Sequence, residues 1–375
     1  MKECSAGQFR RTGPKNGQCA YKRPAKVTHI KMGNRLHSNS ATTLEESVAY
    51  QDQVTLKIKK TGYFGRRSGS RRVSCRVPPP IADASQLIQV GNAAARVSGS
   101  ILPTFDPLGR AAKPCQDSFF LANHSDALLV GVFDGHGAEG KPVARFCCAF
   151  MKTHFKTWLP RLRSSPVRSL ETLVLQCETA LCLSGIDVLL SGATAVLAFL
   201  VGTTAYVATV GDSRAVLAAP STAFPGQPTK PKNPYVRRAL PPTPVEAVAL
   251  TTDQRPNDPA ERQRILASGG QVMPLVDQSG KLVGPHRVWG QTKNLPGLAV
   301  SRSLGNEAGK RCGVIAKPVV TQHSLEEGQI VVLATAGLWT AMSSQEAVDF
   351  AETVRMKASS QSTCTYPATV RLYSG

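Results

Sequence analysis

The sequence predicts an α+β domain in which paired strands form the interior and helices cover them. Apolar runs occur in two pairs, and a short polar or glycine-containing connection joins each pair, as in a β-hairpin. Two stretches with apolar residues at helical spacing lie between these pairs. Strand pairs that alternate with helix pairs are typical of a sandwich. The strands are expected at residues 119–123, 127–133, 194–201 and 204–210, and the helices at residues 143–158 and 170–183.

The second half of the chain adds four elements to this pattern. A short strand follows the turn Gly211-Asp212-Ser213-Arg214, and a helix begins at a proline and ends at two glycines, which are typical start and stop signals. A fully apolar strand and a last helix, with a serine as its N-cap, complete the pattern. These elements are expected at residues 215–218, 259–268, 330–334 and 344–356.

Positive charge is concentrated near the N-terminus. Residues 1–100 carry 18 Lys and Arg against 5 Asp and Glu, whereas the rest of the chain carries 27 against 20. This first part is also rich in Ser, Gly and Pro, as disordered extensions are. We therefore expect a basic, disordered arm at residues 1–95, a globular domain at residues 96–356 with a proline-rich surface insertion at residues 220–244, and an irregular tail at residues 357–375.

The composition limits which binding partners and which cellular location are expected. The basic residues 1–76 could bind an acidic surface or a nucleic acid, which is the weakest of the functional hypotheses. Aromatic residues are sparse in this segment, and it contains no nucleic-acid-binding motif. The ten cysteines form no paired C-x-x-C zinc motif and suit a reducing compartment, so the cytoplasm or nucleus is the default expectation. The longest apolar run, residues 193–201, is too short to span a bilayer. We expect a monomer.

The strongest chemical signal is the run Val132-Phe133-Asp134-Gly135-His136-Gly137. An apolar strand delivers the Asp134 carboxylate at its end, and the following glycine lets a backbone carbonyl turn toward the same point. Carboxylate and carbonyl oxygens are the ligands that Mg²⁺ and Mn²⁺ prefer. The predicted hairpin would bring Asp117 beside Asp134, and Asp212 lies at the end of another strand. Two carboxylates that share a site can organise a pair of cations for hydrolysis.

A series of segments in the same order resembles the PPM family of metal-dependent (type 2C) serine/threonine protein phosphatases. The resemblance covers roughly residues 100–355, and its length makes it far more specific than any single motif. Its segments are Gln116-Asp117, residues 132–137, Ser191-Gly192-Ala193-Thr194-Ala195, residues 211–215, residues 250–253, Arg264-Ile265, residues 269–272, Arg287-Val288, residues 298–305, residues 333–339 and the helix around residues 345–348.

The resemblance implies a four-layer α-β-β-α sandwich with a two-metal centre for Mg²⁺ or Mn²⁺ between its sheets. It also implies hydrolysis of phosphoserine and phosphothreonine in phosphoproteins by direct attack of a metal-activated water. By position, Asp134 would be the ligand that bridges the two metals, and Gly135 would lend its carbonyl. Asp117 would serve the second metal, and Asp212 would hold a further, looser metal through water. Alternatively, Asp212 only caps the turn before Arg214.

The resemblance also implies residues for proton transfer and phosphate binding. His136 falls where the family has its proposed general acid, although a hydrogen-bonded turn histidine is the alternative. Arg110 or Lys113 would orient the phosphate, because a basic residue commonly precedes the acidic pair at Gln116-Asp117. Arg302 is interpreted as a structural ion-pair partner rather than as a catalytic residue.

Two departures from the family pattern affect the expected metal centre. Ala336 stands where the family has a ligand aspartate, and the tail contains neither the expected final strand nor the aspartate that begins it. Asn306 and Thr340 also replace residues that are usually acidic. The sandwich is therefore expected to lack its last strand, and the metal centre to be incomplete. Because even outer-shell losses weaken metal affinity 10- to 100-fold, inner-shell losses should cost more.

Two functions remain open from the sequence. One is a metal-dependent protein phosphatase whose activity is weakened by Ala336 and by the missing terminal aspartate. The other is a catalytically inactive pseudophosphatase that keeps the fold and binds a phosphoprotein or another partner. Retention of Asp117, Asp134, Gly135, His136 and Asp212 favours the first, and the two losses favour the second.

Overall fold

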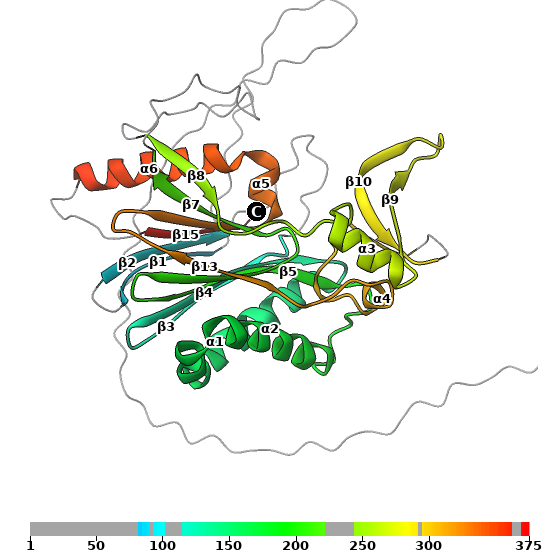
Figure 1. The fold of residues 1–375 in the computed structure, drawn as a ribbon, viewed down its shortest axis with the longest axis horizontal. Coiled ribbons are helices and arrows are strands. Elements are labelled where there is room, and N and C mark those ends of the chain that lie inside the picture. The colour runs from blue at the N-terminus through cyan, green and yellow to red at the C-terminus, as the bar shows by residue number, and fades with distance from the viewer. Residues whose placement is uncertain are drawn as a thin grey trace, which may run out of the picture. The chain divides into compact units, whose positions relative to one another are not determined.

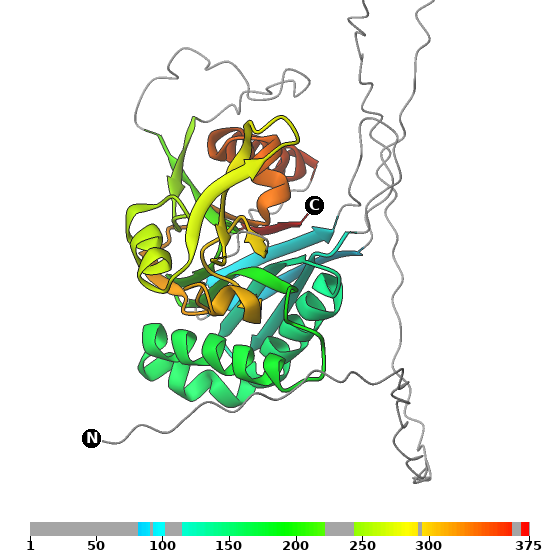
Figure 2. The same ribbon diagram turned by 90° about the vertical axis from the view of Figure 1, so that its right-hand side faces the viewer.

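The two large sheets of the protein pack face to face and carry helices on their outer surfaces. This arrangement is the predicted four-layer α-β-β-α sandwich, and Figures 1 and 2 show helices α1 and α2 on one side of the sheets and α6 on the other. The computed structural model describes residues 82–90, 93–101, 115–221, 244–291, 295–361 and 369–374.

The first sheet is antiparallel and contains both predicted hairpins. Its strand order is β13-β6-β5-β4-β3, with a short β12 pairing to β5. Every residue of β5 except the last is buried, which explains its continuous apolar sequence. The strands are β3 (Ser118–His124), β4 (Ala127–His136), β5 (Gly192–Val201), β6 (Thr204–Val210), β12 (Leu304–Gly305) and β13 (Val319–Ser324).

The second sheet has the order β1-β2-β15-β14-β7-β8. Most neighbouring strands in this sheet are antiparallel, but β15 runs parallel to both β2 and β14. The strands are β1 (Ala82–Val90), β2 (Ala93–Ile101), β7 (Arg214–Pro220), β8 (Val245–Ala249), β14 (Ile330–Ala334) and β15 (Thr369–Ser374).

These strands correct the predicted boundaries at both ends of the domain. Strand β1 and the start of β2 lie within the predicted arm, so the folded region begins by Ala82 rather than at residue 96. Alternation along β2 explains the error, because residues 95, 97, 99 and 101 are buried while residues 96, 98 and 100 are partly exposed, a strand signal that the basic composition concealed. The predicted tail is not irregular throughout either, because β15 fills the gap between β2 and β14 and gives the sheet the strand that was expected to be missing.

The four predicted helices are present. The helices of the structure are α1 (Gly140–Ser164), α2 (Pro166–Cys182), α3 (Pro259–Ala267), α4 (Glu307–Lys310), α5 (Ala336–Ala341) and α6 (Ser344–Gln361). Three of the four predicted helices are longer than predicted, whereas α3 matches its prediction to within one residue and α4 and α5 were not predicted. One apolar core joins α1 and α2 to the first sheet, a second lies between the sheets, and a third joins α6 to the second sheet. Among the described residues, no helix is long and apolar enough to cross a membrane.

A third, small sheet lies at one end of the sandwich together with α3 and α4 (Figure 1). It consists of β9 (Gln271–Val276), β10 (Leu282–Trp289) and β11 (Pro296–Leu298), and was not predicted. Most of the predicted insertion at residues 220–244 lies outside the described residues, as do residues 1–81 of the predicted arm.

Candidate metal centre

Asp117 and Asp134 meet at one end of the β3–β4 hairpin. Ser118 pairs with Phe133, so the residue before β3 lies opposite Asp134. The two carboxyl groups lie close enough to interact, since Asp117 is among the groups that raise the pKa of Asp134. Burial raises the pKa of Asp134 well above its usual range, and the negative charges of Asp117 and Asp212 add to this effect. Neighbouring carboxylates oppose each other's ionisation, so a compensating cation would stabilise the charged form of Asp134.

Asp212 approaches this pair from the neighbouring turn between β6 and β7. Thr194 lies opposite Asp134 in the β4–β5 pairing, and its hydroxyl contacts the Ser213 hydroxyl at 2.6 Å. This contact fixes the turn beside the carboxyl pair. Burial raises the pKa of Asp212, and the Arg255 guanidinium partly offsets that effect. The structure thus gathers the three predicted aspartates, which lie far apart in the sequence.

Gly135 and Gln116 form the close contact between this edge of the sheet and α1. A β-carbon at position 135 would lie 2.1 Å from the backbone oxygen of Gly140 and 2.7 Å from that of Gln116. Only glycine fits between these two backbone segments. The Gln116 side chain donates from Nε2 to the Gly137 carbonyl at 2.8 Å, which holds the turn after Asp134 in place.

The segment Thr335-Ala336 reaches the carboxyl pair from the second sheet. Ala334, the last residue of β14, pairs with Arg214 at the start of β7. The Thr335 hydroxyl then donates to Asp117 Oδ2 at 2.9 Å, and the Ala336 backbone N–H donates to the Asp134 carboxyl. Position 336 is therefore beside the aspartates, as a ligand would be, but its methyl side chain supplies no oxygen.

The donor set fits one hard cation better than two. Asp117 and Asp134 offer adjacent carboxyl oxygens whose mutual repulsion a divalent cation would relieve, which suits Mg²⁺ or Mn²⁺. A second cation would need carboxylates that Ala336 does not provide and that the sequence of β15, Thr-Val-Arg-Leu-Tyr-Ser, does not contain. Within the described ranges, no three His, Cys, Asp or Glu side chains are arranged as a ready metal site.

His136 is held by hydrogen bonds in a neutral form. Its Nε2 lies 2.6 Å from Asn306 Nδ2, and the same amide nitrogen donates to the Ser303 hydroxyl at 3.0 Å. Burial lowers the pKa of His136 to about 4, although a hydrogen bond to the backbone of Asp134 acts in the opposite direction. With Nε2 accepting from Asn306, that nitrogen has no proton to give to a leaving group. This geometry favours the alternative of a hydrogen-bonded turn histidine. Arg110 and Lys113 lie outside the described residues.

Asn306 contacts His136 at the site, and the sequence did not predict this contact. Asn306 occupies the left-handed backbone region with φ of 54° and is buried. A β-carbon at position 192 would lie only 1.9 Å from Asn306 Nδ2, so Gly192 makes room for this side chain. Asn306 was noted only as a departure from an expected aspartate. Nothing local signals its contact with His136, 170 residues away.

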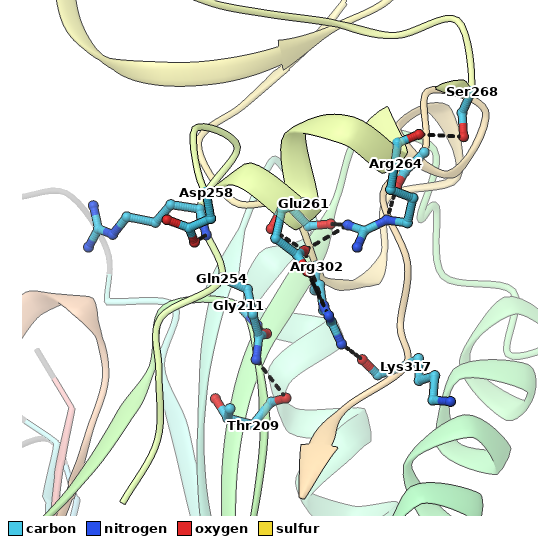
Figure 3. Close-up of polar contacts among 12 residues, drawn as sticks. Thr209, Gly211, Gln254, Asp258, Glu261, Arg264, Ser268, Arg302 and Lys317 are labelled. Atoms are coloured by element: carbon cyan, nitrogen blue, oxygen red, sulfur yellow. Dashed lines mark hydrogen bonds and ion pairs between the residues drawn. The ribbon is translucent and has the colours of Figure 1, made fainter. Parts of the chain in front are cut away.

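Arg302 forms a structural ion pair, as interpreted from the sequence. Its guanidinium contacts both carboxylate oxygens of Glu261, with Nη2 at 2.6 Å from Oε1, and its Nη1 donates to the Lys317 carbonyl (Figure 3). Arg264 and the Ser301 hydroxyl also donate to Glu261. Burial alone would raise the pKa of Glu261, but these donors outweigh it and lower the pKa to about 2. The cluster ties α3 to the strands near the aspartates.

Two further arginines near Asp212 were not predicted. Arg214 binds Asp253 through two parallel contacts of 2.9 and 2.8 Å, and also contacts Ser344 and the Trp339 ring. Arg255 contacts Asp253 at 3.1 Å and Asp212 at 3.6 Å. Sequence reasoning assigned no role to either arginine, although both lie within motifs that carry the resemblance or directly beside them.

Comparison with known proteins places the chain in a family. A family model described as protein phosphatase 2C matches residues 107–367, more than half of the chain. The chain is 32% identical over 253 residues to probable protein phosphatase 2C 34 of Arabidopsis thaliana, covering 62% of this chain and 63% of that protein. It is 34% identical over 245 residues to probable protein phosphatase 2C 48 of Oryza sativa subsp. japonica, covering 59% and 63%. The matched region thus spans less than two thirds of either relative.

A solved structure supports the same fold. The crystal structure of serine-threonine phosphatase 2C from Toxoplasma gondii matches with a TM-score of 0.52 and 20% sequence identity, over 75% of this chain and 90% of that chain. At this identity the likeness concerns the fold alone. The match of the family model over most of the folded region, together with the conjunction of Asp117, Asp134 and Asp212, shows that the chain belongs to the protein phosphatase 2C family.

Proposed function

We propose that this chain is a metal-dependent phosphatase of phosphoserine and phosphothreonine whose activity is weakened by an incomplete metal centre. The single observation that supports it best is the placement of Asp117 and Asp212 beside Asp134, whose pKa their negative charges raise. Carboxylates that lie this close together repel one another unless a cation balances their charge, so the arrangement favours a divalent ion. The family membership supports phosphoproteins as substrates.

The roles of the residues follow from their chemistry. Asp117 and Asp134 would hold Mg²⁺ or Mn²⁺, with the Gly135 carbonyl and Asp212 nearby. When bound, the cation supplies Lewis acidity and makes a nearby water easier to deprotonate. Gln116 and Gly135 keep the end of β4 against α1, and Thr335 orients Asp117, so the chain itself positions the acidic groups.

Two features support weak rather than full activity. Ala336 contributes a backbone N–H where a carboxylate would complete the second metal site. The pKa of His136 is lowered to about 4, so at neutral pH its ring carries a single N–H, and Nε2, which accepts from Asn306, has no proton for the leaving alkoxide. These same features favour the second candidate, a pseudophosphatase that binds a phosphoprotein without hydrolysing it.

Phosphatase assays with two matched variants would separate the candidates. The purified chain, Asp134→Ala and Ala336→Asp would be given Mn²⁺ with a small aryl phosphate and with a phosphothreonine peptide. Slow turnover by the wild type that Asp134→Ala abolishes and Ala336→Asp increases would support the weakened enzyme. No turnover by the wild type, combined with retained binding of the phosphopeptide, would support the pseudophosphatase and contradict the first proposal.

A further inference from the structure

Arg255 is a half-exposed cation fixed at the edge of the acidic centre. Its side chain is 42% exposed, whereas those of its partners Asp212 and Asp253 are 13% and 14% exposed. Its Nη2 lies 3.6 Å from Asp212 Oδ2, which is beyond ordinary hydrogen-bond distance. Arg255 therefore touches the candidate centre on one side and faces solvent on the other.

The loop that carries Arg255 is anchored independently of its guanidinium. The Gln254 side chain accepts from the Gly211 backbone N–H at 2.7 Å, and the Gln254 backbone N–H donates to the Gly211 carbonyl at 2.9 Å. Figure 3 shows Gln254 beside Gly211 and Thr209. On the other side, the Arg255 backbone N–H donates to Asp258 Oδ2 at 2.7 Å. The residue is thus held next to Asp212 by main-chain and neighbouring contacts.

The guanidinium of Arg255 still has donors to offer. Its Nε and Nη2 both reach the same oxygen, Asp253 Oδ2, at 3.4 and 3.1 Å. Asp253 is already bound by Arg214 through two oxygens, so Arg255 is its second and weaker partner. Among the described residues, Nη1 of Arg255 makes no hydrogen bond. An arginine that is positioned but incompletely satisfied is suited to binding an oxyanion such as a carboxylate or a phosphate through two parallel hydrogen bonds.

We propose that Arg255 binds the phosphoryl group of the phosphoprotein at the edge of the acidic centre. This inference rests on the proposed function for the identity of the ligand, but not on catalytic turnover. The phosphoryl oxygens would accept from Nη1 and Nη2, while Asp253 keeps the guanidinium in place. Arg255 thereby offers the positive charge that a dianion needs beside aspartates that would otherwise repel it.

Binding of a non-hydrolysable ligand tests the proposal directly. The probe is a peptide with a phosphonate analogue of phosphothreonine, and its affinity for the full chain is measured with Mn²⁺ and again with EDTA. Arg255→Gln should weaken binding about 10- to 100-fold, as loss of charge-assisted hydrogen bonds does, and Arg255→Lys should recover part of it. Arg262→Gln is the matched control, because Arg262 is exposed on α3 and its substitution removes the same charge.

Further measurements show whether the phosphoryl group itself is recognised, and whether binding and hydrolysis are separate properties. The unmodified peptide should bind weakly and equally to wild type and Arg255→Gln, and a higher concentration of inorganic phosphate should be needed to compete with the phosphonate peptide in Arg255→Gln than in wild type. Equal affinity of wild type and Arg255→Gln for the phosphonate peptide, or no binding by the wild type in either condition, would overturn the proposal. Hydrolysis of the phosphothreonine peptide by the wild type, measured separately, tests the proposed function. The binding role of Arg255 and the proposed phosphatase function can therefore be contradicted independently of each other.

Discussion

The Thr335 hydroxyl donates to Asp117 Oδ2 at 2.9 Å, although the two residues are 218 positions apart in the sequence. Asp117 precedes the first strand of one sheet, and Thr335 follows the apolar strand β14 of the other. The bond therefore joins the two sheets at the point where the carboxyls meet. Because Thr335 is fully buried, its hydroxyl needs a partner, and Asp117 satisfies it.

Asp134→Asn should stabilise the protein without metal and remove its response to metal. Burial raises the pKa of Asp134, so the folded state holds the proton more tightly than the unfolded state. The stability from this proton is complete below the ordinary pKa of 3.8 and is lost as pH rises through the elevated folded pKa. An asparagine has no such loss, so its advantage in thermal unfolding with EDTA should grow with pH.

Added Mn²⁺ provides the second half of this test. Wild type should unfold at a higher temperature with Mn²⁺ than with EDTA, since ligands that bind only the folded state stabilise it. Asp134→Asn should show little of this shift. A variant that is less stable than wild type in EDTA at pH 8 would contradict the raised pKa of Asp134.

Ala336→Asp should increase metal affinity and lower stability in the absence of metal. The new carboxylate would lie beside Asp134, whose carboxyl already accepts from the backbone at position 336. Without a cation the added negative charge is repelled, whereas a cation would gain an inner-shell ligand. We expect Mn²⁺ to bind at least about 10-fold more tightly by calorimetry, on the scale of ligand-shell substitutions. Ala336→Asn, which adds an oxygen without a full charge, is the control and should give a smaller gain.

Gly135→Ala should destabilise the fold and disturb the acidic centre. A β-carbon there would lie 2.1 Å from the Gly140 carbonyl oxygen, and backbone on both sides prevents an easy adjustment. We expect a loss of about 3 kcal/mol in the free energy of unfolding by urea, at the upper end of overpacking costs. Gly185→Ala is the matched control. Unlike Gly135, Gly185 has a positive φ, but no atom lies within 4 Å of its β-carbon position, so only about 1 kcal/mol should be lost to backbone strain.

Local patterns in the sequence were sufficient to predict the hairpins and part of the acidic centre. Strands β3 and β4 are joined by a short turn, so their register follows from adjacency and brings Asp117 opposite Asp134. Strands β5 and β6 follow the same logic. These elements could be predicted because their contacts lie near one another in the chain.

Contacts between remote segments could not be predicted in this way. The bond from Asn306 to His136 depends on a left-handed residue, on Gly192 and on the path of the chain after β12. Strand β15 was missed because a parallel strand between two others needs no local turn signal, and its pairing with β2 and β14 is visible only in the assembled sheet. The role of Arg255 likewise depends on how Gln254 anchors its loop to Gly211.

Glu261→Gln should destabilise the protein at neutral pH but much less in acid. Burial would raise the pKa of Glu261, yet donors from Arg264, Arg302 and Ser301 lower it to about 2. A depressed carboxyl pKa contributes stability that is complete above the ordinary value of 4.5 and is lost as pH falls toward about 2. We expect Glu261→Gln to cost about 2 to 3 kcal/mol at pH 7, the usual scale for hydrogen bonds to a buried charged group. The difference from wild type in urea unfolding should shrink between pH 4.5 and pH 3. Glu327→Gln, at an exposed position, should match wild type throughout, and a pH-independent difference for Glu261→Gln would show that its cost comes from packing rather than from charge.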